Sequence, residues 1–165
     1  MTDMNTGAVK PARPTLLTVI CILSLLFAAY SLITGIIGSL HGTSDEDHVL
    51  VEQKMAEAQD QLAGNPGMEE MMESMRVGTM NSLDNARSIN LGGAISAVLS
   101  LIGVWMMWNL RKVGFWIYLL ATLLGLAVPL HYIGTNVVGF GYVGFFGFIS
   151  LIFIILYAVN LKHMR

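Results

Sequence analysis

The chain of 165 residues has the length of one domain, and 55% of its residues are hydrophobic while only 12% are charged. Soluble domains carry about 25% charged residues, so this composition indicates a membrane protein. The single cysteine, Cys21, excludes an internal disulfide and the paired-cysteine motifs of redox and zinc sites. The net charge of −2 sums strongly segregated charges, and no long basic run indicates nucleic acid as a partner.

A polar segment over residues 1–13 precedes an uncharged run over residues 14–40. We predict a tail and then a first membrane span over these ranges, because about 20 apolar residues let a helix cross a bilayer. A secretory signal peptide is the alternative, but its apolar region has about 7–15 residues and a small-residue cleavage site follows it. The run is longer and no such site follows, which favours the membrane span.

Residues 41–87 form the only long polar stretch of the chain and hold ten of its eleven acidic residues. Ser44 and Asp47 have the spacing of a capping box, and acidic side chains favour the N-terminal end of the helix dipole. Pro66 can end this first helix and begin a second one. Four apolar residues at helical spacing would face the second helix: Val51, Met55, Ala58 and Leu62. We predict a helical hairpin, with a kink or break at 78–82.

Two further uncharged runs follow the polar stretch. The second of them has no Asp, Glu, Lys or Arg over 49 residues, which is enough for two helices with a turn between them. The remaining segments are therefore predicted as a second span over 88–110, a turn over 111–112, a third span over 113–131, a loop over 132–137, a fourth span over 138–161 and a tail over 162–165. The fold class that follows is all-α, an integral membrane four-helix bundle with an extracytoplasmic helical hairpin between its first two spans.

Six basic residues next to the predicted spans fall on one side of this arrangement, whereas the opposite side has three basic and ten acidic residues. The six are Lys10, Arg13, Arg111, Lys112, Lys162 and Arg165. Loops rich in Lys and Arg stay on the cytoplasmic side of a membrane, and the acidic hairpin falls on the opposite side. We therefore predict that both termini are cytoplasmic and that the hairpin is extracytoplasmic.

Small residues recur at helical spacing on two of the predicted spans. They are Gly92, Ser96 and Ser100 on the second span and Gly141, Gly144 and Gly147 on the fourth. Lipid gives no hydrophobic drive for helix association, so small residues matter because they let helix backbones approach closely. We interpret both sets as helix-packing positions, and a small-solute path along the glycines of the fourth span is the alternative.

Residues that could carry chemistry are scarce. No Asp, Glu, Lys or Arg falls inside a predicted span, which speaks against a small proton-coupled exporter. The chain also lacks the HExxH motif, the spacing of a catalytic serine with histidine and acid, and a phosphate-binding glycine loop. We therefore expect no enzymatic activity, no catalytic residue and no cofactor.

The second hairpin helix carries a methionine stripe that spans about 100° of helical arc. The stripe consists of Met68, Met71, Met72 and Met75, and it is interleaved with Glu69, Glu70 and Glu73. Methionine is common on adaptable contact surfaces, and the glutamates suit a solvated face, so we interpret these residues as a contact surface for a protein partner. The alternative is a Cu(I) site at the four methionines, because thioether sulfur is a soft metal ligand.

The first span opens with Arg13-Pro14-Thr15-Leu16-Leu17-Thr18-Val19-Ile20-Cys21-Ile22-Leu23. This run resembles the start of small uncharacterised four-span bacterial membrane proteins with an R-P-T-x-L-T-V-x-C-I-L first span. The resemblance implies four helices in a bacterial cytoplasmic (inner) membrane, and it implies no activity. The sequence as a whole predicts a non-catalytic interaction or scaffold protein that contacts itself or an envelope partner through the hairpin. A copper-binding accessory protein and a small-solute transporter or channel are the alternatives.

Overall fold

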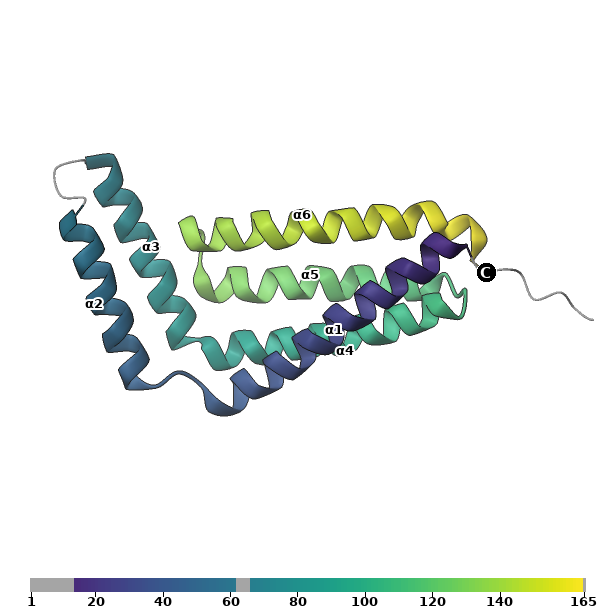
Figure 1. The fold of residues 1–165 in the computed structure, drawn as a ribbon, viewed down its shortest axis with the longest axis horizontal. Helices are drawn as coiled ribbons and strands as arrows, with labels where there is room; N and C mark the ends of the chain where they lie inside the picture. Colours follow the sequence, from purple (N-terminus) through teal and green to yellow (C-terminus); the bar gives the residue numbers. More distant parts are fainter. Residues whose placement is uncertain (1–13, 62–65, 165) are drawn as a thin grey trace, which may run out of the picture.

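The computed structural model describes residues 14–61 and 66–164, and every element within these ranges is a helix (Figure 1). The elements are α1 (Thr15–His41), α2 (Asp45–Gln61), α3 (Pro66–Asp84), α4 (Ala86–Trp108), α5 (Val113–Ile133), α6 (Val137–Asn160) and the short 3-10 helix η1 (Leu161–His163). The predicted tail over 1–13, with Lys10 and Arg13, lies outside the described residues, as do Leu62 and Arg165.

Four of these helices, α1, α4, α5 and α6, are long and apolar enough to cross a membrane. They contain 27, 23, 21 and 24 residues, and each includes an apolar stretch long enough to cross a bilayer. Large apolar side chains point outward from them, since Leu26, Phe145 and Phe148 are 65%, 64% and 66% exposed. The predicted all-α membrane bundle, with a helical hairpin between its first two spans, is confirmed.

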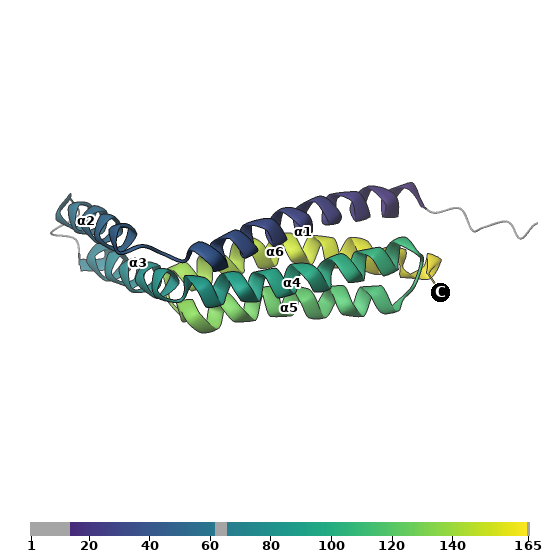
Figure 2. The same ribbon diagram turned by 90° about the horizontal axis from the view of Figure 1, so that it is seen from below.

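The central pair of the bundle is α4 and α5, because α1 packs mainly against α4 and α6 packs mainly against α5. In Figures 1 and 2, α4, α5 and α6 run side by side, whereas α1 crosses them obliquely. The start of α1 and the C-terminal end of the chain lie at the same end of the bundle, where Leu17 and Met164 belong to one buried cluster, and we call it the terminal end (Figure 1). The opposite end carries α2 and α3, and we call it the hairpin end.

A buried cluster at the terminal end joins all four spans. It contains Leu17, Ile20, Cys21, Val104, Met107, Phe115, Tyr157 and Met164. The hydroxyl of Tyr157 on α6 donates a hydrogen bond to Ser24 Oγ on α1 at 2.8 Å. The ring of Tyr157 also packs edge-on against Tyr118 of α5, with 5.1 Å between ring centroids. These contacts hold α1 and α6 together at this end.

Glycines allow the spans to approach closely on both sides of α4. A Cβ atom added at Gly103 of α4 would lie 2.8 Å from Tyr118 N and 2.9 Å from Gly114 O, both on α5. A Cβ added at Gly35 of α1 would lie 3.1 Å from Ala94 N on α4. Backbone atoms cannot move aside as a flexible side chain can, so a larger residue at Gly103 would push α4 and α5 apart, and one at Gly35 would be tightly packed against α4.

The predicted packing residues of the second span lie on two different surfaces of α4. Gly92 faces Val128 of α5 so closely that a Cβ atom would clash with it. The hydroxyl of Ser96 is buried and donates to Ala121 O of α5 at 2.7 Å. Ser100 is half-buried and faces a cavity between the spans. Gly92 and Ser96 therefore lie at the interface between α4 and α5.

The glycines of the fourth span have open surroundings. Gly141 and Gly144 are exposed, and a Cβ atom added at either would meet nothing within 4 Å. A Cβ added at Gly147 would make an ordinary contact with Leu126 at 3.8 Å. Within the described residues, none of the three brings α6 into close backbone contact with another helix.

The hairpin helix α3 lies across the hairpin end of α5 and α6 (Figure 1). The predicted break at 78–82 is wrong, because α3 continues through this range to Asp84. Gly78 packs directly against Asn136, at a place where a Cβ atom would clash, and the hydroxyl of Ser82 donates to Gly78 O at 2.8 Å. Packing against the end of α6 thus stabilises a stretch whose intrinsic helix propensity is low.

Candidate functional site

The first candidate site is the surface of the α2–α3 hairpin, which the bundle holds in place through α3. The side chain of Asn81 donates to Ile133 O of α5 at 3.1 Å. The hydroxyl of Ser74 accepts a hydrogen bond from the backbone N–H of Val137 at 3.2 Å. These two bonds attach α3 to both sides of the α5–α6 loop, so the hairpin has a fixed base.

The predicted cap at the start of α2 forms in the structure. Asp47 Oδ2 accepts hydrogen bonds from the backbone N–H of Ser44 at 3.0 Å and from its hydroxyl at 2.8 Å. The backbone N–H of Asp47 donates back to Ser44 Oγ at 3.3 Å. Because the two donors of Ser44 stabilise the carboxylate, the pKa of Asp47 is lowered from its ordinary value. A further bond, from Thr43 Oγ1 to Leu83 O at 2.7 Å, joins this end of α2 to α3.

Helix α2 is attached to α3 along one face and is otherwise open. None of its residues is buried, and its half-buried residues have helical spacing: His48, Val51, Met55 and Ala58. On its other faces, Val49 is 65% exposed and Leu50 is 50% exposed. Two adjacent apolar side chains on a polar helix outside the spans form a small surface patch that the described chain leaves uncovered.

The structure places the methionine stripe partly on the surface and partly in the interior. Met72 is buried and Met75 is half-buried, whereas Met68 and Met71 are 38% and 45% exposed. Two of the four predicted residues are therefore available to a partner or a metal from outside. No group of three or more His, Cys, Asp or Glu side chains is placed to hold a metal in the described ranges.

The glutamates beside the stripe remain on the surface. Glu69, Glu70 and Glu73 are exposed. Glu73 accepts two hydrogen bonds from the guanidinium of Arg76, both 2.9 Å long. This charged pair lowers the pKa of Glu73 and raises that of Arg76. We define the exposed side chains Val49, Leu50, Met68, Met71, Glu69 and Glu70 as the hairpin surface.

Charge is divided between the two ends of the bundle. The hairpin end carries the acidic side chains of α2 and α3, which outnumber its three basic residues. The terminal end carries Arg111 and Lys112 in the α4–α5 turn and Lys162 after α6, all three of them exposed. The structure thus places the described basic residues of the predicted cytoplasmic side together at one end.

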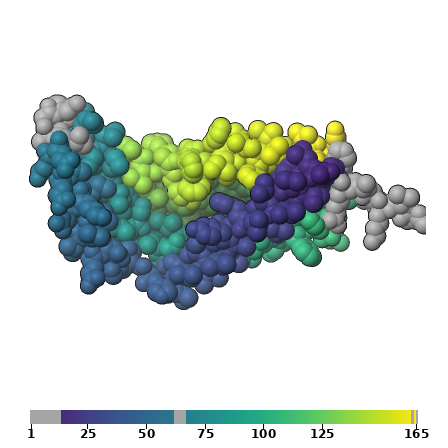
Figure 3. Space-filling view, viewed as in Figure 1, coloured from purple at the N-terminus to yellow at the C-terminus, as the bar shows by residue number. Residues whose placement is uncertain are grey.

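The second candidate site is a cavity of about 620 Å³ between α1, α4, α5 and α6. From the terminal end, where Tyr157 joins α6 to α1, the two helices diverge toward the hairpin end (Figures 1 and 3). Helices α4 and α5 form the back wall of the space that opens between them. We call this space the membrane cavity.

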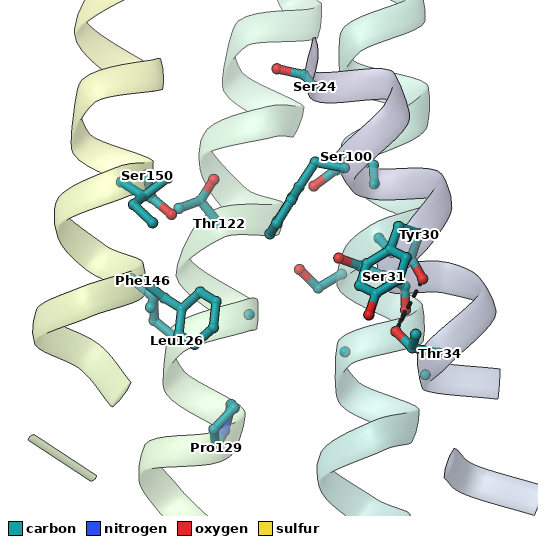
Figure 4. A pocket seen from close by; sticks show the side chains of 18 of the residues that line it. Ser24, Tyr30, Ser31, Thr34, Ser100, Thr122, Leu126, Pro129, Phe146 and Ser150 are labelled. Carbon is teal, nitrogen blue, oxygen red and sulfur yellow. Dashed lines mark hydrogen bonds between the residues drawn. The ribbon is translucent and has the colours of Figure 1, made fainter. Parts of the chain in front are cut away.

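Hydroxyl groups and aromatic rings line the membrane cavity (Figure 4). The hydroxyl-bearing residues are Ser24, Tyr30, Ser31, Thr34, Ser96, Ser100, Tyr118, Thr122, Tyr142 and Ser150. No Asp, Glu, Lys, Arg or His is among the lining residues. The cavity can therefore exchange hydrogen bonds with a ligand, but its lining offers no charged or readily titratable partner.

The sequence interpretation missed this cavity, although α1 carried a signal for it. Ser24, Ala28, Ser31 and Gly35 repeat every three or four residues, so α1 has one small and partly polar face in an otherwise apolar span. The residues of α6 that reach the cavity include Tyr142, Phe146 and Ser150. Gly141, Gly144 and Gly147, the predicted solute path, do not line it.

Comparisons with family models, with curated proteins and with solved structures find no match to this chain.

Proposed function

We propose that the protein is a non-catalytic, multi-pass protein of the bacterial cytoplasmic membrane that binds a protein partner, either a second copy or another envelope protein, through the hairpin surface. Both termini lie in the cytoplasm in this proposal, and the hairpin lies outside it. The basic side chains at the terminal end and the acidic side chains at the hairpin end support this orientation, because Lys and Arg are retained on the cytoplasmic side.

One observation carries the proposal: hydrogen bonds to α5 and α6 hold α3 in place, and α2, which has no buried residue, packs against α3 with its other faces exposed. Because no residue of α2 is buried, packing contributes little to holding this helix in place. The position of α2 therefore depends on the hydrogen bonds that attach α3 to the bundle. The exposed pair Val49 and Leu50 and the exposed methionines Met68 and Met71 supply apolar contact area. Methionine adapts its shape to different partners, which suits a contact surface.

Charge supplies the specificity in this proposal. The hairpin surface is surrounded by acidic side chains, including Asp45 and Glu46 in the first turn of α2. A partner with Lys or Arg side chains around an apolar centre would complement it. Salt screens such exposed charges over about 10 Å at 0.1 M, so binding should weaken as salt is raised.

Photocrosslinking in native membranes tests this function. A photoreactive benzophenone amino acid is placed at Met71 on the hairpin surface, and at Leu120 on α5 as a lipid-facing control, since Leu120 is 53% exposed on a span. We expect a discrete protein adduct from Met71 and none from Leu120. The adduct should disappear when Val49 and Leu50 are both replaced by Asp, and it should persist in Gln59→Asp, which adds charge without removing apolar area.

The absence of an adduct from Met71, or an adduct that survives the Val49→Asp/Leu50→Asp change, would contradict the proposed contact. The size of the adduct distinguishes a second copy from a different protein.

Orientation is tested separately with a thiol reagent that does not cross membranes. A cysteine at Gln59 should react in intact cells, and a cysteine at Asn109 only after permeabilisation; the reverse order would refute the orientation.

A further inference from the structure

The membrane cavity is closed toward the terminal end and open sideways. The buried cluster around Leu17, Val104 and Tyr157 fills the space between the spans at the terminal end. From Ser24 toward the hairpin end, the distance between α1 and α6 increases (Figure 1), and no side chain of the hairpin lines the cavity. The cavity is therefore a side pocket of the bundle at the depth of the bilayer and not a passage through it.

Three serine hydroxyls of this pocket make no hydrogen bond in the described parts of the chain: Ser31 on α1, Ser100 on α4 and Ser150 on α6. Other lining hydroxyls bond to carbonyls of their own helix, as Thr34 does with Tyr30 O at 3.0 Å and Thr122 with Tyr118 O at 2.9 Å. A polar group left unbonded in hydrocarbon costs several kcal/mol, about the cost of burying an amide or hydroxyl without a partner. Among the described residues no buried side-chain oxygen or nitrogen lacks a partner, so the three hydroxyls are accessible from the pocket and can bond to a polar group that enters it.

The lining also limits the charge of that group. A phosphate or ammonium headgroup would find no opposite charge there, and burying an unpaired charge is far more costly than burying an alcohol. A hydroxyl or carbonyl can pair with Ser31, Ser100 or Ser150, because a serine hydroxyl both donates and accepts. The rings of Phe27, Tyr142 and Phe146 supply apolar walls beside these hydroxyls.

We propose that the membrane cavity binds the headgroup of an uncharged lipid, one whose polar part is a hydroxyl or carbonyl group, which enters from the bilayer between α1 and α6. A volume of about 620 Å³ lies within the range of about 300–1,000 Å³ that small-molecule sites have. The acyl or isoprenoid chains of the lipid remain in the opening between the two helices. This site is separate from the hairpin surface and does not depend on the function proposed for it.

Two glycine substitutions form a matched pair for testing the proposal. Gly93 on α4 lines the cavity, and a Cβ atom there would meet nothing within 4 Å, so Gly93→Leu places its side chain in the cavity space. Gly144 on α6 also has nothing within 4 Å of an added Cβ but does not line the cavity. Gly144→Leu therefore makes the same chemical change on an outer surface.

The experiment uses the full chain in phosphatidylcholine nanodiscs and a diacylglycerol that carries a photoreactive diazirine in its glycerol region. After irradiation, mass spectrometry measures the labelling of each peptide. We expect labelling of the cavity-lining parts of α1, α5 and α6, reduced at least tenfold in Gly93→Leu and less than twofold in Gly144→Leu. Equal labelling of the wild type and Gly93→Leu would overturn the proposal, as would equal loss in both variants.

Two further measurements test the role of the hydroxyls and the exclusion of charge. The triple variant Ser31→Ala/Ser100→Ala/Ser150→Ala keeps the cavity but removes three hydroxyls, so it should lose the preference for diacylglycerol over its methyl ether that we expect of the wild type. A preference that remains in the triple variant would contradict hydroxyl recognition. A phosphatidylglycerol diazirine should label the lining at least fivefold less. Equal labelling, or a crosslink between two copies through the cavity, would mean that acyl chains or a second protein fill it.

Discussion

The close contact of α4 and α5 at Gly103 makes a quantitative prediction for Gly103→Ala. The added methyl would lie 2.8 Å from Tyr118 N, 2.9 Å from Gly114 O and 3.1 Å from Tyr118 Cα, all backbone atoms. Since unstrained contacts lie at about 3.5–4.0 Å, the two helices must separate by roughly 0.5–1 Å. Overpacking of this kind costs about 1–3 kcal/mol, and the higher helix propensity of Ala returns about 0.5–1 kcal/mol.

We therefore expect Gly103→Ala to lower the free energy of unfolding by about 1–2 kcal/mol, which is a five- to thirty-fold change in the ratio of folded to unfolded protein. The measurement is unfolding in mixed detergent micelles as the mole fraction of dodecyl sulfate rises, followed by circular dichroism. Gly144→Ala is the control, because nothing lies within 4 Å of its added methyl. It should keep or slightly raise stability. If both variants shift the midpoint equally and in the same direction, the assigned contact of α4 and α5 is wrong.

Three further predictions concern hydrogen bonds at defined places in the structure. Tyr157→Phe removes the bond to Ser24, so in the same micelle titration it should cost about 0.6 kcal/mol, the average for bonds between membrane helices, and at most about 1.7 kcal/mol. Asp47→Asn weakens the cap with Ser44 and should raise hydrogen exchange in the first turn of α2. Because the folded pKa of Asp47 is lowered, the cap is at full strength above the ordinary carboxyl pKa and is lost as the pH falls through the lowered value, which backbone chemical shifts at stepped pH would detect. Asn81→Ala removes one of the two bonds between α3 and the α5–α6 loop, so we expect faster hydrogen exchange over α3 with unchanged protection in α4.

Each of these variants has a control that makes the same chemical change at a place where the tested bond is absent. Tyr30→Phe alters an exposed tyrosine and should not change the titration midpoint. Asp60→Asn removes a carboxylate near the opposite end of α2, where it forms no cap, so the first turn should keep its protection. Asn109→Ala removes an exposed side chain that bonds only its own helix, to Trp105 O, and should leave α3 unchanged. If a control changes the titration midpoint or the hydrogen exchange as much as its test variant does, the stabilising role assigned to that hydrogen bond is wrong.

The features that local sequence specifies were predicted well. The uncharged runs gave the all-helical membrane bundle, and the Ser44–Asp47 spacing gave a cap that forms with bonds of 2.8–3.3 Å. The predicted break at 78–82 is absent because the loop before α6 packs against Gly78, a contact that helix propensity alone does not include. Propensity is a local quantity, and tertiary contacts routinely override it.

The partners of the close contacts and the shape of the cavity depend on features that no local pattern contains, although α1 carries a small and partly polar face. Gly92 and Gly144 have the same small side chain, yet one meets Val128 and the other meets nothing, because a glycine permits close approach without specifying which helix will approach. The membrane cavity depends on the angle of α1 to α6, and the bond that closes its narrow end joins Tyr157 to Ser24, 133 residues apart in the chain. A hydrogen bond between residues so far apart in the chain can be identified only when the relative positions of α1 and α6 are known.

The attachment of α3 to the loop before α6 also has a mechanical consequence. Only Gly139, Tyr157 and Asn160 are buried on α6, so this span resists tilting less than the central pair does. A partner that pulls on the tip of the hairpin would transmit the force through Ser74 to the first residue of α6. Because Tyr157 bonds the far part of α6 to Ser24 of α1, a displacement of the hairpin would change the distance between α6 and α1 mainly at the end next to the hairpin.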